Sequence, residues 1–122
     1  MKKILVMILA VSIVPTLVNA TDVRCNEISK EINEKTKYIA WEKVMEVERA
    51  TSVKGARFIP SKKIPQLQSE ISLYIQQGKD LDCPAYTGDL TGKPYYGIAK
   101  KCVESKFLSR EYCDKTNWVA TQ

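Results

Sequence analysis

The chain has 122 residues, a formal net charge of +5 and no histidine. Because the chain has no imidazole, it cannot form a Ser-His-Asp or Cys-His nucleophilic site or bind a metal through histidine. It also lacks the commonest general base near neutral pH. Its length suits one small domain and leaves no room for a second.

The first segment has the pattern of a bacterial secretory signal peptide. Lys2 and Lys3 form a positive start, residues 4–14 are an apolar run, and small residues lead to Ala20. Pro15 is expected to end any helix there. The apolar run is shorter than the about 20 residues that a membrane-spanning helix needs. Because no cysteine follows Ala20, the sequence argues against a lipoprotein anchor.

We therefore expect residues 1–20 to be a cleaved signal peptide of Gram-negative type and residues 21–122 to be a single exported domain. Its location would be the periplasm or the outside of the cell. Without Lys2 and Lys3, the domain has 17 basic and 14 acidic residues, a net charge of +3. This small excess needs no nucleic acid or anionic lipid to explain it, and we expect neither a nucleic-acid partner nor an integral membrane span.

All the cysteines lie in the expected domain: Cys25, Cys83, Cys102 and Cys113. An even number in a small exported domain predicts two disulfides, and four cysteines allow three pairings. We favour Cys25–Cys83 with Cys102–Cys113, which pins the start of the domain to its middle and closes a short loop. The spacing lacks the close cysteine pairs of zinc sites, so we expect no metal and no cofactor.

Helical periodicity extends over residues 22–51, either as one helix or as two with a bend near Lys35. Asp22 is a plausible N-cap. The apolar stripe is formed by Cys25, Ile28, Ile32, Tyr38, Trp41 and Met45. Charged residues on the opposite positions, with Glu42 and Glu46 among them, predict a solvated face.

A loop over residues 53–65 is expected to separate this segment from a second helix that begins at residue 65 and ends just before residue 78. Pro65 suits the first helical turn, and Gly78 suits the position after the last residue. A long loop over residues 79–93 follows. We expect Pro94 to open a third helix that continues through Ser105.

Ser109 is expected to cap a fourth, short helix through Lys115. Trp118 and Val119 are expected to pack back as a tail. No segment alternates with period two. The predicted fold is therefore all-α, a small irregular bundle of three to five helices stapled by two disulfides.

The stretch TGDLTGKPYYG resembles a phosphate-binding loop only superficially. Only three residues separate Gly88 from Gly92, and Pro94 stands where a magnesium-binding hydroxyl is required. These glycines predict turns instead. We expect no nucleotide site there.

Two loops are candidate partner-binding surfaces. The first gathers three of the six tyrosines, which either cover the core or form a recognition surface. Its residues are Tyr86, Tyr95 and Tyr96. The second surrounds an aromatic residue with cations, and the alternative is an ordinary solvated loop. Its residues are Arg57, Phe58, Lys62 and Lys63.

Carboxylates offer two further sites, both weaker. Glu42 and Glu46 beside Trp41 have the residue types of a glycosidase pair, but nearby lysine and arginine favour a solvated helix face. Asp80 and Asp82 match two positions of a calcium loop, and no further side-chain oxygen follows at the required spacing.

We therefore expect an exported, non-enzymatic protein-binding domain whose partner is another envelope or secreted protein. An inhibitor or immunity protein that neutralises a toxin or hydrolase fits this description. The first alternative is an accessory or assembly component of an envelope machine for conjugation or secretion, docked through the helical stripe around Trp41. The second alternative is a small carboxylate-dependent enzyme.

Overall fold

The computed structural model describes residues 2–52 and 60–120, with side chains for residues 21–51 and 60–120. Four α-helices, two short 3-10 helices and no strand occur in these ranges. The elements are α1 (Lys2–Ser52), α2 (Lys63–Asp80), η1 (Lys93–Tyr95), α3 (Tyr96–Glu104), α4 (Arg110–Cys113) and η2 (Lys115–Asn117). The predicted all-α fold is thereby confirmed.

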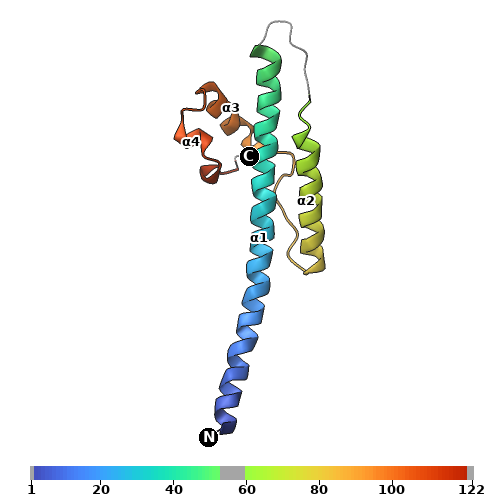
Figure 1. Ribbon diagram of the computed structural model, residues 1–122, viewed down its shortest axis with the longest axis vertical. Helices are drawn as coiled ribbons and strands as arrows, with labels where there is room; N and C mark the ends of the chain where they lie inside the picture. Colours follow the sequence, from blue (N-terminus) through green and yellow to red (C-terminus); the bar gives the residue numbers. More distant parts are fainter. Residues whose placement is uncertain (1, 53–59, 121–122) are drawn as a thin grey trace.

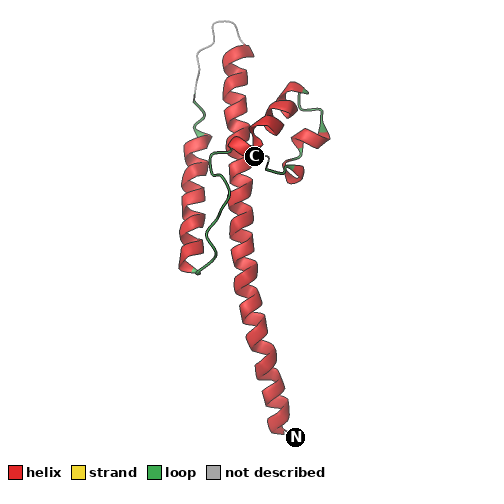
Figure 2. Cartoon of the chain, turned by 180° about the vertical axis from the view of Figure 1, so that it is seen from behind, coloured by secondary structure: helices red, strands yellow, loops and turns green. Residues whose placement is uncertain are grey.

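Helix α1 is the central element, and the other helices pack on its C-terminal half. Figure 1 shows α2 running back along one side of α1, while α3 and α4 lie on the other side. Figure 2 shows the same arrangement from behind. An element covered on two sides must bury two stripes of side chains.

The first stripe faces α2. Ile28, Ile32 and Ile39 of α1 meet Ile71 of α2, and all four are at most 3% exposed. Positions 28, 32 and 39 are separated by one and two helical turns, so they lie on one face. Partly buried Leu67 and other apolar residues of α2 pack around this cluster.

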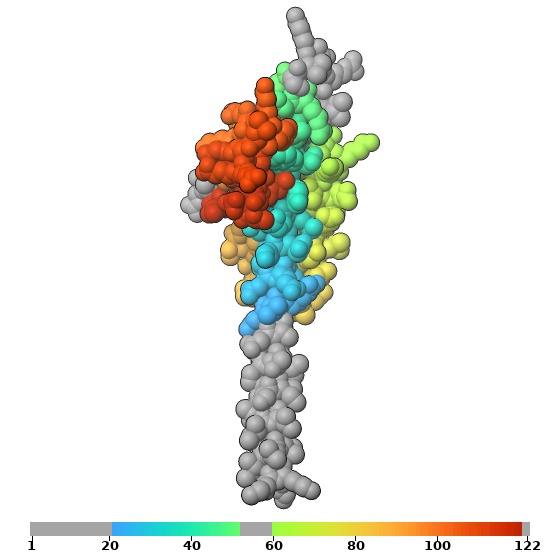
Figure 3. Space-filling model, turned by 60° about the vertical axis from the view of Figure 1, so that its left-hand side comes forward, coloured from blue at the N-terminus to red at the C-terminus, as the bar shows by residue number. Residues whose placement is uncertain are grey.

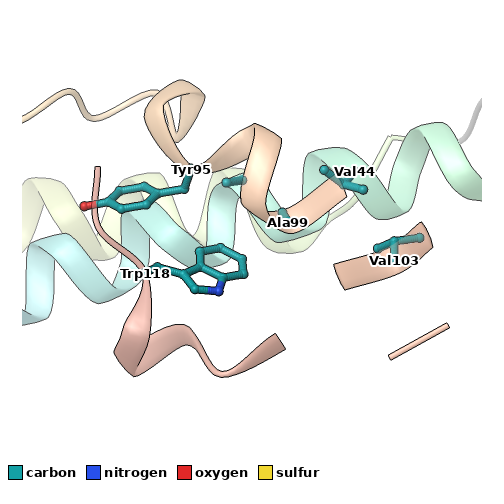
Figure 4. Close-up of a cluster of buried hydrophobic side chains, with 6 residues drawn as sticks. Val44, Tyr95, Ala99, Val103 and Trp118 are labelled. Carbon is teal, nitrogen blue, oxygen red and sulfur yellow. The ribbon is translucent and has the colours of Figure 1, made fainter. Parts of the chain in front are cut away.

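The second stripe faces the C-terminal elements. Ala40 and Val44 of α1 pack against a cluster that spans η1, α3 and the tail. The cluster is completed by Tyr95, Ala99, Val103 and Trp118. In Figure 4 the rings of Tyr95 and Trp118 face each other over α1, with centroids 6.3 Å apart. Because residue 40 follows residue 39 by about 100° of helical rotation, the two clusters lie on adjacent faces.

Helix α1 is one continuous helix, which is one of the two alternatives that the sequence left open, and it corrects two details of the sequence prediction. It has no break near Lys35, and Asp22 lies inside it and is no N-cap. It also continues through Pro15, although proline lacks the N–H for one backbone hydrogen bond and disfavours a helix interior. The cleavage site expected after Ala20 also lies within this helix, and the signal peptide stays a prediction.

Helix α2 is longer than predicted at both ends. It begins at Lys63, before Pro65, and ends at Asp80. Gly78 is therefore inside the helix and not after it, where it is buried beside the Cys83 side chain. The chain then reverses at Asp82, which has a φ of 55°.

The predicted third helix is divided into η1 and α3, with Pro94 in the first of these. The predicted cap of α4 is confirmed, because Ser109 accepts a hydrogen bond from the Tyr112 N–H. Helix α4 is shorter than expected and ends at Cys113, before η2 begins. Of the two tail residues, Trp118 is buried as predicted, whereas Val119 is 73% exposed.

Both favoured disulfides are confirmed. Cys25–Cys83 joins α1 to the segment after α2, with Cα atoms 5.6 Å apart. Cys102–Cys113 joins α3 to α4, with Cα atoms 4.9 Å apart. Two disulfides in a small domain indicate an oxidising compartment. Among the helical residues with described side chains, no stretch is long and apolar enough to cross a bilayer.

Candidate partner-binding surface

The tyrosine loop contributes to the core. Tyr95 is only 5% exposed, and its hydroxyl donates a hydrogen bond to Asn33. Burial raises the pKa of Tyr95, and the neighbouring Tyr86 raises it further. Tyr86 and Tyr96 are each partly buried against one of the two clusters. Tyr95 thus offers little surface to a partner, and the role of Tyr86 and Tyr96 stays a prediction.

The glycine-rich stretch forms a turn that packs closely on α1. Asp89 accepts hydrogen bonds from the N–H and hydroxyl of Thr91, and these bonds lower the pKa of its carboxyl. Gly92 has a φ of +78°, and a Cβ there would lie 2.7 Å from the backbone nitrogen of Ala40. Lys43 of α1 donates to the Thr91 carbonyl at 2.7 Å. Gly92 therefore allows the backbone of this turn to lie close to the backbone of α1.

The basic loop is only partly described. Arg57 and Phe58 lie outside the described residues. Lys62 is exposed, and Lys63 lies at the start of α2 with its side chain 75% exposed. The Lys63 ammonium is 3.8 Å from a carboxylate oxygen of Glu42.

The expectation of a solvated face at Glu42 and Glu46 is wrong for Glu42. Glu42 is 7% exposed and accepts a hydrogen bond from the Ser61 hydroxyl at 2.8 Å. Glu46, which is partly buried, accepts one from the Ser61 N–H. The Ser61 oxygen in turn accepts from the Lys63 N–H at 3.2 Å. The two carboxylates therefore hold the segment that enters α2, which gives both a structural role.

An apolar surface that the sequence did not reveal lies across α1 and the turn after α3. We call it the aromatic face and define it by Tyr38, Trp41, Phe107 and Leu108. The Phe107 ring lies 5.5 Å from the Trp41 ring. Tyr38, Phe107 and Leu108 are 45%, 53% and 83% exposed. In Figure 3 the segment from α3 to η2, orange to red, forms a raised part of the surface beside α1.

The turn that carries Phe107 and Leu108 has an unusual backbone. Lys106 and Phe107 have φ values of 57° and 66°, the left-handed region that side chains with a Cβ disfavour by about 1–2 kcal/mol per residue. Backbone bonds stabilise this geometry, because Lys106 and Phe107 donate to the carbonyls of Val103 and Cys102 at 2.9 and 3.2 Å. The disulfide of Cys102 closes the same loop. These constraints hold two large apolar side chains toward water.

A cavity of about 430 Å³ adjoins the aromatic face, between α1, the first turns of α2 and η2. We call it the lysine pocket, because Lys35, Lys63 and Lys115 line it together with the rings of Tyr38 and Trp41; one carboxylate, that of the buried Glu42, also lines it. The Lys115 ammonium lies 4.6 Å from the centre of the Tyr38 ring and 4.5 Å from that of Trp41. Desolvation lowers the pKa of Lys115, although Glu34 and Glu42 oppose this shift.

A contact beside the lysine pocket fixes the backbone of η2, which carries Lys115. Lys37 is 4% exposed, and its ammonium donates to the Lys115 carbonyl at 2.9 Å. The same ammonium lies 3.3 Å from Glu34. Lys37 therefore attaches η2 to α1, and the position of Lys115 follows from that attachment.

A smaller cavity of about 180 Å³ lies beside the Cys25–Cys83 disulfide. Ile28, Tyr74 and Tyr86 line it, and they belong to the buried cluster between α1 and α2 or pack at its edge. Since its lining is mainly apolar, it has no set of charged groups that would select a ligand.

The fold and the surface define a small all-α domain with two disulfides and an exposed aromatic face. Comparison with protein-family models, with curated proteins and with solved structures finds no match for this chain. In the ranges with described side chains, no group of three cysteine or acidic residues is arranged to hold a metal ion. The aromatic face and the lysine pocket are therefore the features of this chain that bear on its function.

Proposed function

We propose that this chain is an exported, non-enzymatic protein-binding domain of the bacterial envelope. It binds another envelope or secreted protein and neutralises it, as an inhibitor or immunity protein does with a toxin or hydrolase. The observation that supports this proposal is the turn that holds Phe107 and Leu108 toward water beside Trp41. The periplasm is the compartment that fits both the predicted signal peptide and the disulfides.

The free energy available from burying its side chains favours a binding role for this turn. Burial of a leucine or phenylalanine side chain stabilises a complex by about 1.5–3 kcal/mol. The turn is already fixed by the Cys102–Cys113 disulfide, so a partner has little loop entropy to remove. Aromatic residues in a well-packed centre are the usual anchors of protein interfaces. A fixed apolar turn beside Trp41 has the properties of such an anchor.

The first test is capture of the partner by the oxidised protein produced from the full reading frame. The immobilised protein is incubated with envelope and secreted fractions of its host and of neighbouring strains. We expect one soluble partner, retained in near-equal amount. The double variant Phe107→Ala/Leu108→Ala should retain less than about a tenth of it, as expected when anchor residues are removed.

Leu73→Ala is the matched control, because Leu73 is 65% exposed on α2 and belongs neither to the aromatic face nor to the lysine pocket. Its capture should equal that of the unchanged protein. Equal capture by the Phe107/Leu108 double variant would contradict the proposal.

The same experiment separates the two alternatives. An accessory component of a conjugation or secretion machine would retain a set of membrane-associated subunits, and Val47 on α1, 46% exposed, adds apolar surface for such docking. A carboxylate-dependent enzyme would lose activity in Glu42→Gln at unchanged stability. Since Glu42 accepts a buried hydrogen bond from Ser61, we expect that variant to lose stability instead.

A further inference from the structure

We propose that the lysine pocket receives a carboxylate side chain from an acidic segment of the partner protein. Lys115 is the main cationic contact, Lys63 is the second, and Trp41 forms the apolar wall. This inference rests on the proposed function, because it gives the chemistry of the partner that the aromatic face binds.

The Lys115 ammonium has unused hydrogen-bonding capacity. An ammonium has three N–H donors. Within the described part of the chain, that of Lys115 makes no hydrogen bond and has no carboxylate within 4.0 Å; its close contacts are the Tyr38 and Trp41 rings. Aromatic faces attract a cation but accept no conventional hydrogen bond. An incoming carboxylate would supply what the desolvated ammonium lacks.

The other two lysines of the pocket are in a different state. Lys35 lies 3.8 Å from Glu31 and 3.3 Å from Glu70, so its charge is already balanced. Lys63 has one carboxylate, Glu42, at 3.8 Å, and its side chain is mostly exposed. Lys63 can therefore turn toward a second carboxylate, whereas Lys35 contributes mainly to the wall.

The size and position of the pocket favour a protein segment over a free anion. Ligand pockets usually enclose about 300–1,000 Å³, and this one, at about 430 Å³, admits a side chain together with its flanking backbone. Tyr38 and Trp41 belong both to the pocket and to the aromatic face. A peptide that occupies the pocket therefore continues directly over Phe107 and Leu108.

The experiment uses the oxidised full chain and two capped hexapeptides. The first contains three leucines and three glutamates, and the second has glutamine in place of every glutamate. NMR spectra of the indole N–H groups report binding, because Trp41 lines the pocket whereas Trp118 is buried and donates to the Tyr112 carbonyl. We expect the glutamate peptide to move the Trp41 signal and to bind about ten-fold more tightly than the glutamine peptide.

Variants assign the effect to the pocket. Lys115→Gln should weaken binding of the glutamate peptide about ten-fold, and Lys115→Arg, which keeps the charge, should retain most of it. Lys63→Gln should weaken it by a smaller factor, which gives a second test if Lys115→Gln does not fold. Lys30→Gln is the matched control, because Lys30 is exposed and lies outside the pocket. Its binding should not change.

Three results would overturn the inference. The first is equal affinity for the two peptides. The second is competition by inorganic phosphate at the same affinity as the glutamate peptide, which would mean an unspecific anion site. The third is binding to phosphatidylglycerol vesicles that Lys115→Gln abolishes while the peptide does not bind, which would mean a membrane surface.

The two proposals can fail separately. If a partner is captured through Phe107 and Leu108 but Lys115→Gln leaves its affinity unchanged, the acidic-segment inference is wrong and the proposed function stands. If the glutamate peptide binds as expected but no partner is captured, the proposed function loses its support and the pocket is confirmed as a carboxylate site.

Discussion

The charged side chain of Lys115 lies in a position that lowers the stability of the folded state. Its ammonium is partly withdrawn from water, and this desolvation lowers its pKa. A lysine whose pKa falls on folding destabilises the folded state while it is charged, and this cost disappears only as the pH rises toward its ordinary pKa. Such costs are common at functional sites.

Lys115→Met should therefore keep or raise the melting temperature. Methionine retains an apolar chain of similar length between Tyr38 and Trp41 and removes the desolvated charge. Thermal unfolding followed by circular dichroism measures this, with Lys30→Met as an exposed control. A melting temperature lowered by more than a few degrees in the Lys115 variant alone would mean that Lys115 stabilises the fold.

The raised pKa values of two tyrosines predict that the folded state is less stable at alkaline pH. Burial raises the pKa of both Tyr86 and Tyr95 above 10.0. The folded state therefore keeps these phenols protonated while the unfolded chain ionises, so stability is complete below pH 10 and declines as the pH rises through the folded pKa values. The urea midpoint should be lower at pH 11 than at pH 8. Tyr95→Phe should reduce this difference, and an unchanged difference would exclude a contribution from Tyr95.

Charged residues of α1 were the hardest to place from the sequence. Lys37 and Glu42 occupy positions that an amphipathic pattern assigns to solvent, yet they are 4% and 7% exposed. The pattern assumes one buried face, whereas α1 is covered on two adjacent sides. The partners of these charges are the Lys115 carbonyl and the Ser61 hydroxyl, both far along the chain. Local periodicity contains no information about them.

At the scale of elements, the loop before η1 depends on one glycine. Gly92→Ala should destabilise the domain by about 2–4 kcal/mol, because it adds left-handed strain and a Cβ 2.7 Å from the Ala40 nitrogen. Gly97→Ala is the matched control, since nothing lies within 4 Å of its Cβ position in α3. That variant should be neutral or gain up to about 1 kcal/mol in helix propensity. Urea unfolding of both variants measures the loss of stability. Equal midpoints would contradict the proposed close packing of Gly92 against Ala40.

The C-terminal disulfide should contribute both to folding and to binding. Cys102→Ala/Cys113→Ala opens a loop with a sequence separation of 11, which costs about 3 kcal/mol in a chain-entropy model. It also releases the turn that presents Leu108, so chymotrypsin should cleave there faster and partner capture should fall. Mass spectrometry of the digest locates the cut. Unchanged cleavage and capture would show that the turn is rigid without the disulfide.

Elements with local signals could be predicted from the sequence. The position of α2, the Ser109 cap and both disulfides followed from periodicity, residue type and cysteine spacing. The aromatic face could not be predicted, because Trp41 and Phe107 meet only after α3 has packed on α1. The adjacent apolar pair at Phe107 and Leu108, outside any predicted helix, was the one sequence signal that pointed to it.

For the whole molecule, the positive charge is unevenly distributed. Residues 21–92 contain eleven basic and eleven acidic residues, whereas residues 93–120 contain six basic and three acidic ones. The net charge of +3 therefore belongs to the C-terminal segment that carries Phe107 and Leu108. An uneven charge of this kind orients a protein before contact with an acidic partner.

The association rate with the captured partner should therefore decrease with salt. Between 20 and 200 mM sodium chloride we expect a decrease of about ten-fold, because screening shortens the range of charge steering, while the dissociation rate changes less. Surface plasmon resonance measures both rates. Lys106→Gln should flatten the salt dependence and Lys30→Gln should reduce it less; a rate independent of salt would argue against an acidic partner.

The connectivity of the disulfides has a consequence for biogenesis. The cysteines pair in chain order, the first with the second and the third with the fourth: Cys25 with Cys83 and Cys102 with Cys113. When a chain emerges N-terminus first, Cys83 is the first available partner of Cys25, and Cys113 is the first available partner of Cys102. Oxidation in order of emergence thus yields the native pairs, whereas either scrambled set requires a cysteine to skip its neighbour. Cells that lack a disulfide isomerase should accordingly produce this protein in undiminished yield.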